Sequence, residues 1–114
     1  MKKETIKVIY KEPDKEPEVR EIVNTLDTFQ ALVEGYIETV RLTKNAIVVC
    51  NEEGKLNGMK ANIWIPQGDV IFGPVVVVGD AGEDFGDVPE EEVMDLLAVE
   101  ELYIYHIKNH SRFD

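Results

Sequence analysis

Apolar and polar residues near the start of the chain follow a pattern that predicts a β-hairpin. An apolar run at residues 6–10 and a second apolar group around Val19 and Ile22 are separated by a polar, proline-containing segment at residues 11–17. Proline and aspartate favour turns, and polar segments of this kind join paired strands. We therefore expect residues 5–23 to form two antiparallel strands.

The next apolar pattern is helical. Apolar side chains from Leu26 to Val33 recur three or four residues apart, which is the spacing of one helix face. Asn24 precedes this pattern as a favourable N-cap residue, and Gly35 follows it as a C-terminal stop. The pattern predicts a helix over residues 25–34.

The central part of the chain contains several segments rich in β-branched residues. Apolar positions at residues 36–42 and 46–50 predict two strands, and a further short apolar element covers residues 63–65. The most apolar run, at residues 70–78, contains successive valines and predicts a central strand buried on both faces. Pro74 cannot donate to a sheet ladder, so the chain bulges there or the strand starts after it.

A second helix is predicted after a turn at residues 79–82. Asp87 is placed to cap this helix, and Glu90 completes a capping-box pattern. Nothing further along breaks the pattern, so the helix either continues through residues 102–107 or breaks near Val99 and gives way to a final strand. Both endings are open from the sequence.

The element order is β-β-α-β-β-β-α, which predicts an α+β fold. Hairpin connections outnumber helical crossovers, so we expect a mainly antiparallel sheet of about five strands. We expect the two helices to cover one face of that sheet. The length of 114 residues is typical of a single domain over residues 1–114.

The charge balance narrows the classes of partner. The chain has 23 acidic and 12 basic residues, for a formal net charge of −11. This balance disfavours nucleic acids, whose counterions must be replaced by Lys and Arg, and it disfavours anionic membranes. It is compatible with a basic protein partner, a divalent cation or simple solubility. Cys50 is the only cysteine, and no apolar stretch approaches the ~20 residues of a membrane helix, so we expect a cytoplasmic protein.

Residues 80–101 are rich in Asp and Glu and contain no Lys or Arg. This acidic block directly follows the most apolar run of the chain. Part of this acidic block is expected to serve the fold, through the capping roles of Asp87 and Glu90. The block would meet a basic protein partner through a complementary charged surface. The residues predicted to form this surface are Glu83, Asp84, Asp87, Glu91 and Glu92.

Catalytic and metal sites find little support in the sequence. The carboxylates between Asp80 and Asp87 cluster in a glycine-rich loop, but their spacing is not that of an EF-hand. His106 and His110 are four residues apart, yet they lack the adjacent Glu of metalloprotease helices. No pairing of a nucleophile with a base is evident, and we expect a protein that is not an enzyme and has no cofactor.

Two further hypotheses concern other partners. The segment at residues 102–107 is more apolar than one helix face requires, which predicts self-association. The residues expected in that contact are Leu102, Ile104 and Ile107. As an alternative to a macromolecular partner, the protein would bind a small, nucleotide-like ligand. The candidate polar groups for such a ligand are Asn51, Asn62 and Arg41.

Three stretches of the chain together resemble a known family. They are residues 16–38, residues 50–58 with the sequence Cys-Asn-Glu-Glu-Gly-Lys-Leu-Asn-Gly, and residues 73–85, which end in Gly-Asp-Ala-Gly-Glu-Asp-Phe. In this order they resemble a small uncharacterised domain family of unknown function, found in Gram-positive anaerobes, their phages and mobile elements. The resemblance covers about residues 6–95, and residues 99–114 form a C-terminal extension beyond it.

The resemblance carries over no catalytic residue, because no activity is established for that family. It implies a genomic setting in which small acidic proteins act as accessory or counter-defence factors that bind host proteins. The sequence therefore favours a non-enzymatic accessory protein that binds a basic macromolecular partner through an acidic surface.

Overall fold

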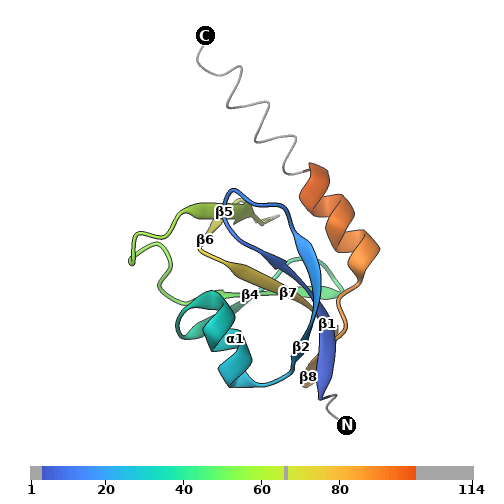
Figure 1. The fold of residues 1–114 in the computed structure, drawn as a ribbon. Helices are drawn as coiled ribbons and strands as arrows, with labels where there is room; N and C mark the ends of the chain where they lie inside the picture. Colours follow the sequence, from blue (N-terminus) through green and yellow to red (C-terminus); the bar gives the residue numbers. More distant parts are fainter. Residues whose placement is uncertain (1–3, 66, 100–114) are drawn as a thin grey trace.

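The computed structural model describes residues 4–65 and 67–99, and it shows an α+β fold built on one main antiparallel sheet (Figure 1). The helices are α1 (Leu26–Val33) and a second helix at residues 90–99. The strands are β1 (Thr5–Lys11), β2 (Glu18–Val23), β3 (Ile37–Arg41), β4 (Ala46–Asn51), β5 (Ala61–Trp64), β6 (Val70–Phe72), β7 (Val75–Ala81) and β8 (Asp84–Gly86). The predicted fold class is confirmed, with more strands than expected.

The strand β7 lies at the centre of the main sheet, whose strand order is β2-β1-β7-β4-β3. All four of its valines are fully buried, and they alternate between two cores because successive side chains of a strand point to opposite faces. The predicted central strand, starting after Pro74, is confirmed. The residues before Pro74 form β6, which leaves the main sheet and pairs with β5 in a separate hairpin.

The two helices lie on opposite faces of the main sheet, so the expectation that both cover one face is wrong (Figure 1). Phe29 and Val33 of α1 belong to the core on one face. Val93 and Leu97 of the second helix belong to the core on the other face, together with Ile63 of β5. A central strand that is apolar on both faces needs cover on both, because a one-sided arrangement would leave a row of valines in water.

Tertiary contacts decide where α1 begins and ends. Thr25 is the N-cap, and its Oγ1 accepts a hydrogen bond from the Thr28 N–H at 3.3 Å. The predicted cap, Asn24, is instead buried against β8. At the C-terminal end, Glu34 takes the left-handed conformation, with φ 66°, that the sequence predicts for Gly35.

The hairpin formed by β7 and β8 replaces the short turn predicted at residues 79–82. The strand β7 continues to Ala81, the chain turns through Gly82 with φ 81°, and β8 pairs back onto β7. The register places Asp80 opposite Phe85. The acidic residues Glu83 and Asp84 are thereby held at a defined position beside the end of the main sheet.

The second helix begins at residue 90, where the Val93 N–H donates to the Pro89 carbonyl at 3.1 Å. The predicted cap at Asp87 is wrong by position, because the helix starts three residues later and its first bond is accepted by Pro89. The Asp87 Oδ1 accepts a hydrogen bond from the Lys7 N–H of β1 at 2.9 Å. Both predicted endings of this helix fall at residues outside the described range. The same holds for the self-association residues and the histidine pair, which are Leu102, Ile104, Ile107, His106 and His110.

Replacement of Gly79 by Ala is expected to destabilise the fold strongly. A Cβ at Gly79 would lie 2.0 Å from the carbonyl oxygen of Asp87, which is backbone and cannot move aside alone. We expect Gly79→Ala to lower the free energy of unfolding by about 2–3 kcal/mol in urea denaturation. The control is Gly58→Ala, where no atom lies within 4 Å and only the φ of 75° is unfavourable, at about 1 kcal/mol. Equal losses for the two variants would contradict this packing.

Candidate functional site: a hollow between α1 and β8

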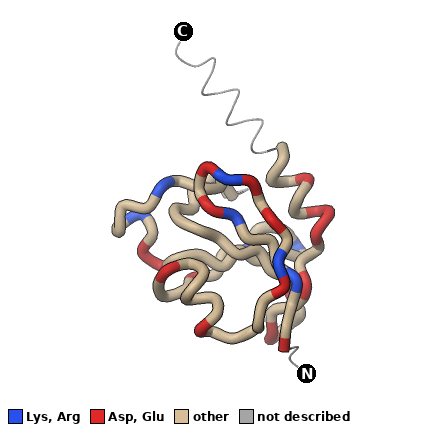
Figure 2. Tube along the Cα trace, viewed as in Figure 1, with Lys and Arg blue, Asp and Glu red and all other residues tan. Residues whose placement is uncertain are grey.

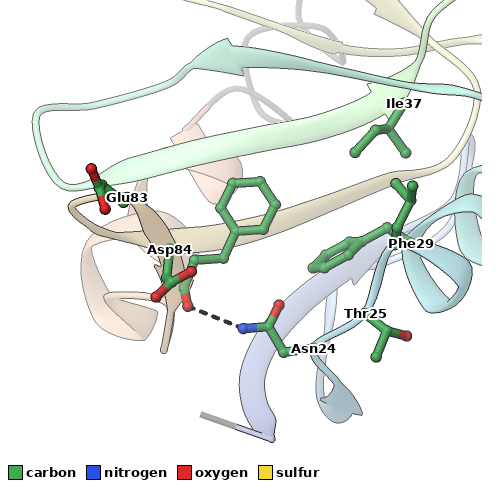
Figure 3. A pocket seen from close by; sticks show the side chains of 8 residues that line it. Asn24, Thr25, Phe29, Ile37, Glu83 and Asp84 are labelled. Carbon is green, nitrogen blue, oxygen red and sulfur yellow. Dashed lines mark hydrogen bonds between the residues drawn. The ribbon is translucent and has the colours of Figure 1, made fainter. Parts of the chain in front are cut away.

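A hollow of about 210 Å³ opens on the surface where the start of α1 faces the β7–β8 hairpin (Figure 3). Its residues come from four parts of the chain: the link after β2, the first turns of α1, the start of β3, and β8 with the preceding turn. The lining residues are Asn24, Thr25, Leu26, Phe29, Ile37, Glu83, Asp84 and Phe85.

Asn24 connects the two sides of this hollow. Its backbone N–H donates to the Glu4 carbonyl at 2.8 Å, and its side-chain Nδ2 donates to the Phe85 carbonyl at 3.3 Å. The residue is only 4% exposed. Its Oδ1 has no hydrogen-bond partner within residues 4–65 and 67–99, and it points into the hollow on the side between Asp84 and Phe29 (Figure 3).

Two aromatic rings form the apolar part of the hollow. Phe29 of α1 and Phe85 of β8 meet edge to face, with ring centroids 5.3 Å apart and an interplanar angle of 77°. Phe29 is buried in the core beneath α1, while Phe85 is half-buried and remains accessible at the edge. Leu26 adds an exposed apolar side chain at the mouth. The hollow therefore offers an aromatic base with an apolar rim on the helix side.

The opposite rim is acidic. Glu83 is exposed and Asp84 is half-buried, and neither carboxylate forms an ion pair or accepts a hydrogen bond within the part of the chain that the structure describes. No Lys or Arg is among the lining residues. The β1–β2 hairpin differs, because acidic and basic residues are intermixed along it (Figure 2). Among the described residues, no cationic side chain therefore pairs with the two negative charges beside the hollow.

The structure divides the predicted interaction residues into two groups. Glu83 and Asp84 stand at the hollow, whereas the other three lie elsewhere. Asp87 bonds to β1, and the Glu92 carboxylate accepts a hydrogen bond from the Thr43 hydroxyl at 3.0 Å. Glu91 is exposed on the second helix, which covers the opposite face of the sheet. A role for these three in binding stays a prediction.

The carboxylates between Asp80 and Asp87 do not gather into a metal site. Within the described ranges, no group of three or more His, Cys, Asp or Glu residues could hold a metal ion. Asp80 is occupied by the fold: one oxygen accepts from Arg41 at 2.8 Å, and the other accepts from the Gly82 N–H at 3.0 Å. The hydrogen bond from Arg41 is the main cause that holds the pKa of Asp80 below its ordinary value.

The polar groups proposed for a small ligand are also engaged within the fold. The Asn51 amide donates to the last carbonyls of α1, at Val33 and Glu34, and a Cβ at Gly35 would come within 2.7 Å of it. The Asn62 amide donates to the carbonyls of Lys11 and Gly73 at 2.8 Å. Arg41 binds Asp80 and the carbonyls of the β3–β4 turn. The motif at residues 50–58 therefore contains a residue, Asn51, that terminates a helix.

Cys50 behaves as a small core residue. It is 2% exposed on β4, and its sulfhydryl lies 3.6 Å from the Glu38 carbonyl. Burial raises the pKa of the Cys50 thiol to about 11. Because the thiolate is the reactive form of cysteine, this residue is poorly suited to be a nucleophile near neutral pH.

The sequence pointed to the acidic rim of the hollow but missed its interior. Asn24 carried only a capping prediction, and Phe29 was identified only as part of a helix face. The signal that could have indicated the site is Phe85, an aromatic residue placed directly after Glu83 and Asp84. The convergence of these residues depends on β8, a strand of three residues that periodicity cannot reveal.

These features define a small α+β domain with an acidic, aromatic-based hollow at one end of its sheet. Compared with known protein families, residues 6–102 match the family described as "Domain of unknown function (DUF3846)". The match spans most of the chain, and the protein belongs to this family, as the sequence resemblance indicates. No curated protein and no solved structure matches the chain.

Neither helix in residues 4–65 and 67–99 is both long enough and apolar enough to cross a membrane.

The Arg41–Asp80 pair predicts a pH-dependent contribution to stability. The folded-state pKa of Asp80 is lowered, so the stabilisation is present above its unfolded-state pKa and is lost as the pH falls through the folded value. Wild type should therefore be more stable than Asp80→Asn at about pH 7, and the difference should be smaller at about pH 3. Urea midpoints measured at both pH values test this. Asp95→Asn, an exposed site on the second helix, is the control, and a difference that grows on acidification would contradict the assignment.

Proposed function

We propose that this protein is a non-enzymatic interaction protein that binds a basic macromolecular partner through the acidic rim of the hollow. The observation that carries the proposal is the position of Glu83 and Asp84. Both flank a surface hollow, and both lack a described cationic neighbour. A partner that brings Lys or Arg to this rim would complement the charge and associate faster at low salt.

The aromatic base of the hollow supports the same function. A purely solvating acidic surface needs no hollow, whereas the half-buried Phe85 and the exposed Leu26 at this recess offer apolar area that a partner can bury. Recognition sites commonly combine such an apolar centre with a polar rim. The combination favours specific contact over simple solubility.

The broader setting is also part of the proposal. A cytoplasmic accessory protein of phage or mobile-element type, acting on a host protein, fits a small acidic domain of this kind. A nucleotide-like ligand fits less well. The hollow of about 210 Å³ is below the ~300–1,000 Å³ of typical ligand pockets, and the polar groups first considered for such a ligand are bonded within the fold.

Capture of basic proteins from a bacterial lysate, followed by charge reversal, tests the proposal. The wild type should retain basic proteins at about 0.05 M salt and lose most of them at about 0.5 M, because screening weakens exposed charge pairs. The double variant Glu83→Lys/Asp84→Lys should lose them at both salt concentrations. The matched control is Glu52→Lys/Glu53→Lys, which makes the same charge change on an exposed turn away from the hollow.

Two results would count against a binding role for the hollow. The first is retention of the same proteins by Glu83→Lys/Asp84→Lys. The second is equal loss by the hollow variant and the control variant, which would show that net charge alone determines capture.

A further inference from the structure

We propose that the hollow recognises an arginine side chain of the basic partner, with Asn24 and Phe85 as the residues that select its guanidinium group. This inference rests on the proposed function and specifies the chemical group that the site binds. It is carried by two properties of the hollow: the acceptors that it presents and the aromatic surface at its base.

Every polar side-chain group that the hollow has free to bind a partner is an acceptor. Asn24 is only 4% exposed, and its Oδ1 has no hydrogen-bond partner among the described residues. No buried side-chain nitrogen or oxygen in the described part of the chain lacks a partner, so this oxygen is accessible from the hollow and can accept a hydrogen bond from a group that enters it. The carboxylates of Glu83 and Asp84 add two anionic acceptors on the facing rim.

The aromatic base favours a guanidinium over an ammonium group. A guanidinium is planar, is weakly hydrated for a cation, stacks on aromatic faces and presents five donors in a fixed fork. It can lie against Phe85 while its N–H groups reach the Asn24 oxygen and a carboxylate. A lysine ammonium is a compact and strongly hydrated charge that gains less from the rings. Leu26 at the mouth provides apolar surface for the methylene stem.

An anionic ligand is disfavoured even though α1 begins beside the hollow. Helix N-termini attract anions through their free N–H groups. Here the Thr25 hydroxyl accepts from the Thr28 N–H, and Asp27 places a negative charge in the first helical turn. Together with Glu83 and Asp84, these groups make the mouth unfavourable for phosphate.

Titration of the ¹⁵N-labelled protein with N-acetyl-arginine amide tests the inference. This small probe should give saturable chemical-shift changes with a dissociation constant on the order of 1 mM, a strength ordinary for a ligand of its size. The largest changes should fall on the Asn24 side-chain amide and on the backbone amides of Asp84 and Phe85. N-acetyl-lysine amide should bind about tenfold more weakly, and the neutral citrulline derivative should show no saturation.

Substitutions at the hollow test whether the arginine probe binds there, and a surface pair keeps the test valid if a buried substitution disrupts folding. The isosteric pair Glu83→Gln/Asp84→Asn lies at the surface and should fold normally, yet weaken arginine binding about tenfold. The pair Glu52→Gln/Glu53→Gln is the matched control and should bind as the wild type does. Phe85→Leu should reduce the preference for arginine over lysine while leaving the charge unchanged. Asn24→Ala should weaken binding if it folds, and the surface pair keeps the test decisive if it does not.

Several outcomes would overturn the inference. They are equal affinity for the arginine and lysine probes, no saturation up to about 20 mM, shifts confined to the second helix, and competition by inorganic phosphate or AMP. The failures of the two proposals are distinguishable. Charge-dependent capture from lysate without arginine binding rejects the guanidinium assignment alone, whereas arginine binding without any captured basic protein rejects the proposed function alone.

Discussion

Val75, Val76, Val77 and Val78 have no exposed surface on either face of the main sheet, and this two-sided burial requires cover on both sides. The helix α1 supplies it on one face, and the second helix with the β5–β6 hairpin supplies it on the other. Each fully buried side chain of this kind is worth about 1.5–3 kcal/mol in transfer free energy, so a one-sided arrangement would be costly. The placement of the acidic residues follows from this layering.

The position of the hollow is a consequence of how β7 ends. Beyond Gly79 the strand turns through Gly82 and returns as β8, so its carboxylates emerge next to the N-terminus of α1. The chain then crosses to the other face as the second helix, and Glu91 and Glu92 go with it. One acidic block in the sequence thereby becomes two surfaces in space, and Glu83 and Asp84 of the first surface line the hollow beside α1.

Local patterns predicted the elements whose periodicity is strong. The valine run, the first hairpin and α1 could be identified because apolar residues repeat there at strand or helix spacing. The face of the sheet that each helix covers could not be predicted. That choice depends on which face of the central strand the other elements of the fold leave exposed. Asn24 and Thr25 are both good caps, but Asn24 is bonded to Glu4 and Phe85, and Thr25 takes the cap position.

The residues of the candidate site likewise include some that the sequence predicted and others that only the fold reveals. Glu83 and Asp84 could be identified because an acidic run after a buried strand must face water, but the fold assigns separate roles to Asp80, Asp87 and Asn51. Those roles are hydrogen bonds between residues far apart in the chain, which composition and spacing do not encode. The glycines and acids of the family motifs accordingly serve the architecture in part, and Glu83 and Asp84 are the unpaired acids that line the hollow.

Intermolecular nuclear Overhauser effects between bound N-acetyl-arginine amide and the protein test the central claim most directly, because they locate the cation itself. The account predicts contacts from the arginine δ-methylene protons to the ring protons of Phe85 and to the methyl groups of Leu26, with the guanidinium directed toward Asn24. Contacts confined to the second helix, or contacts scattered over the acidic surface without any to Phe85, would contradict it.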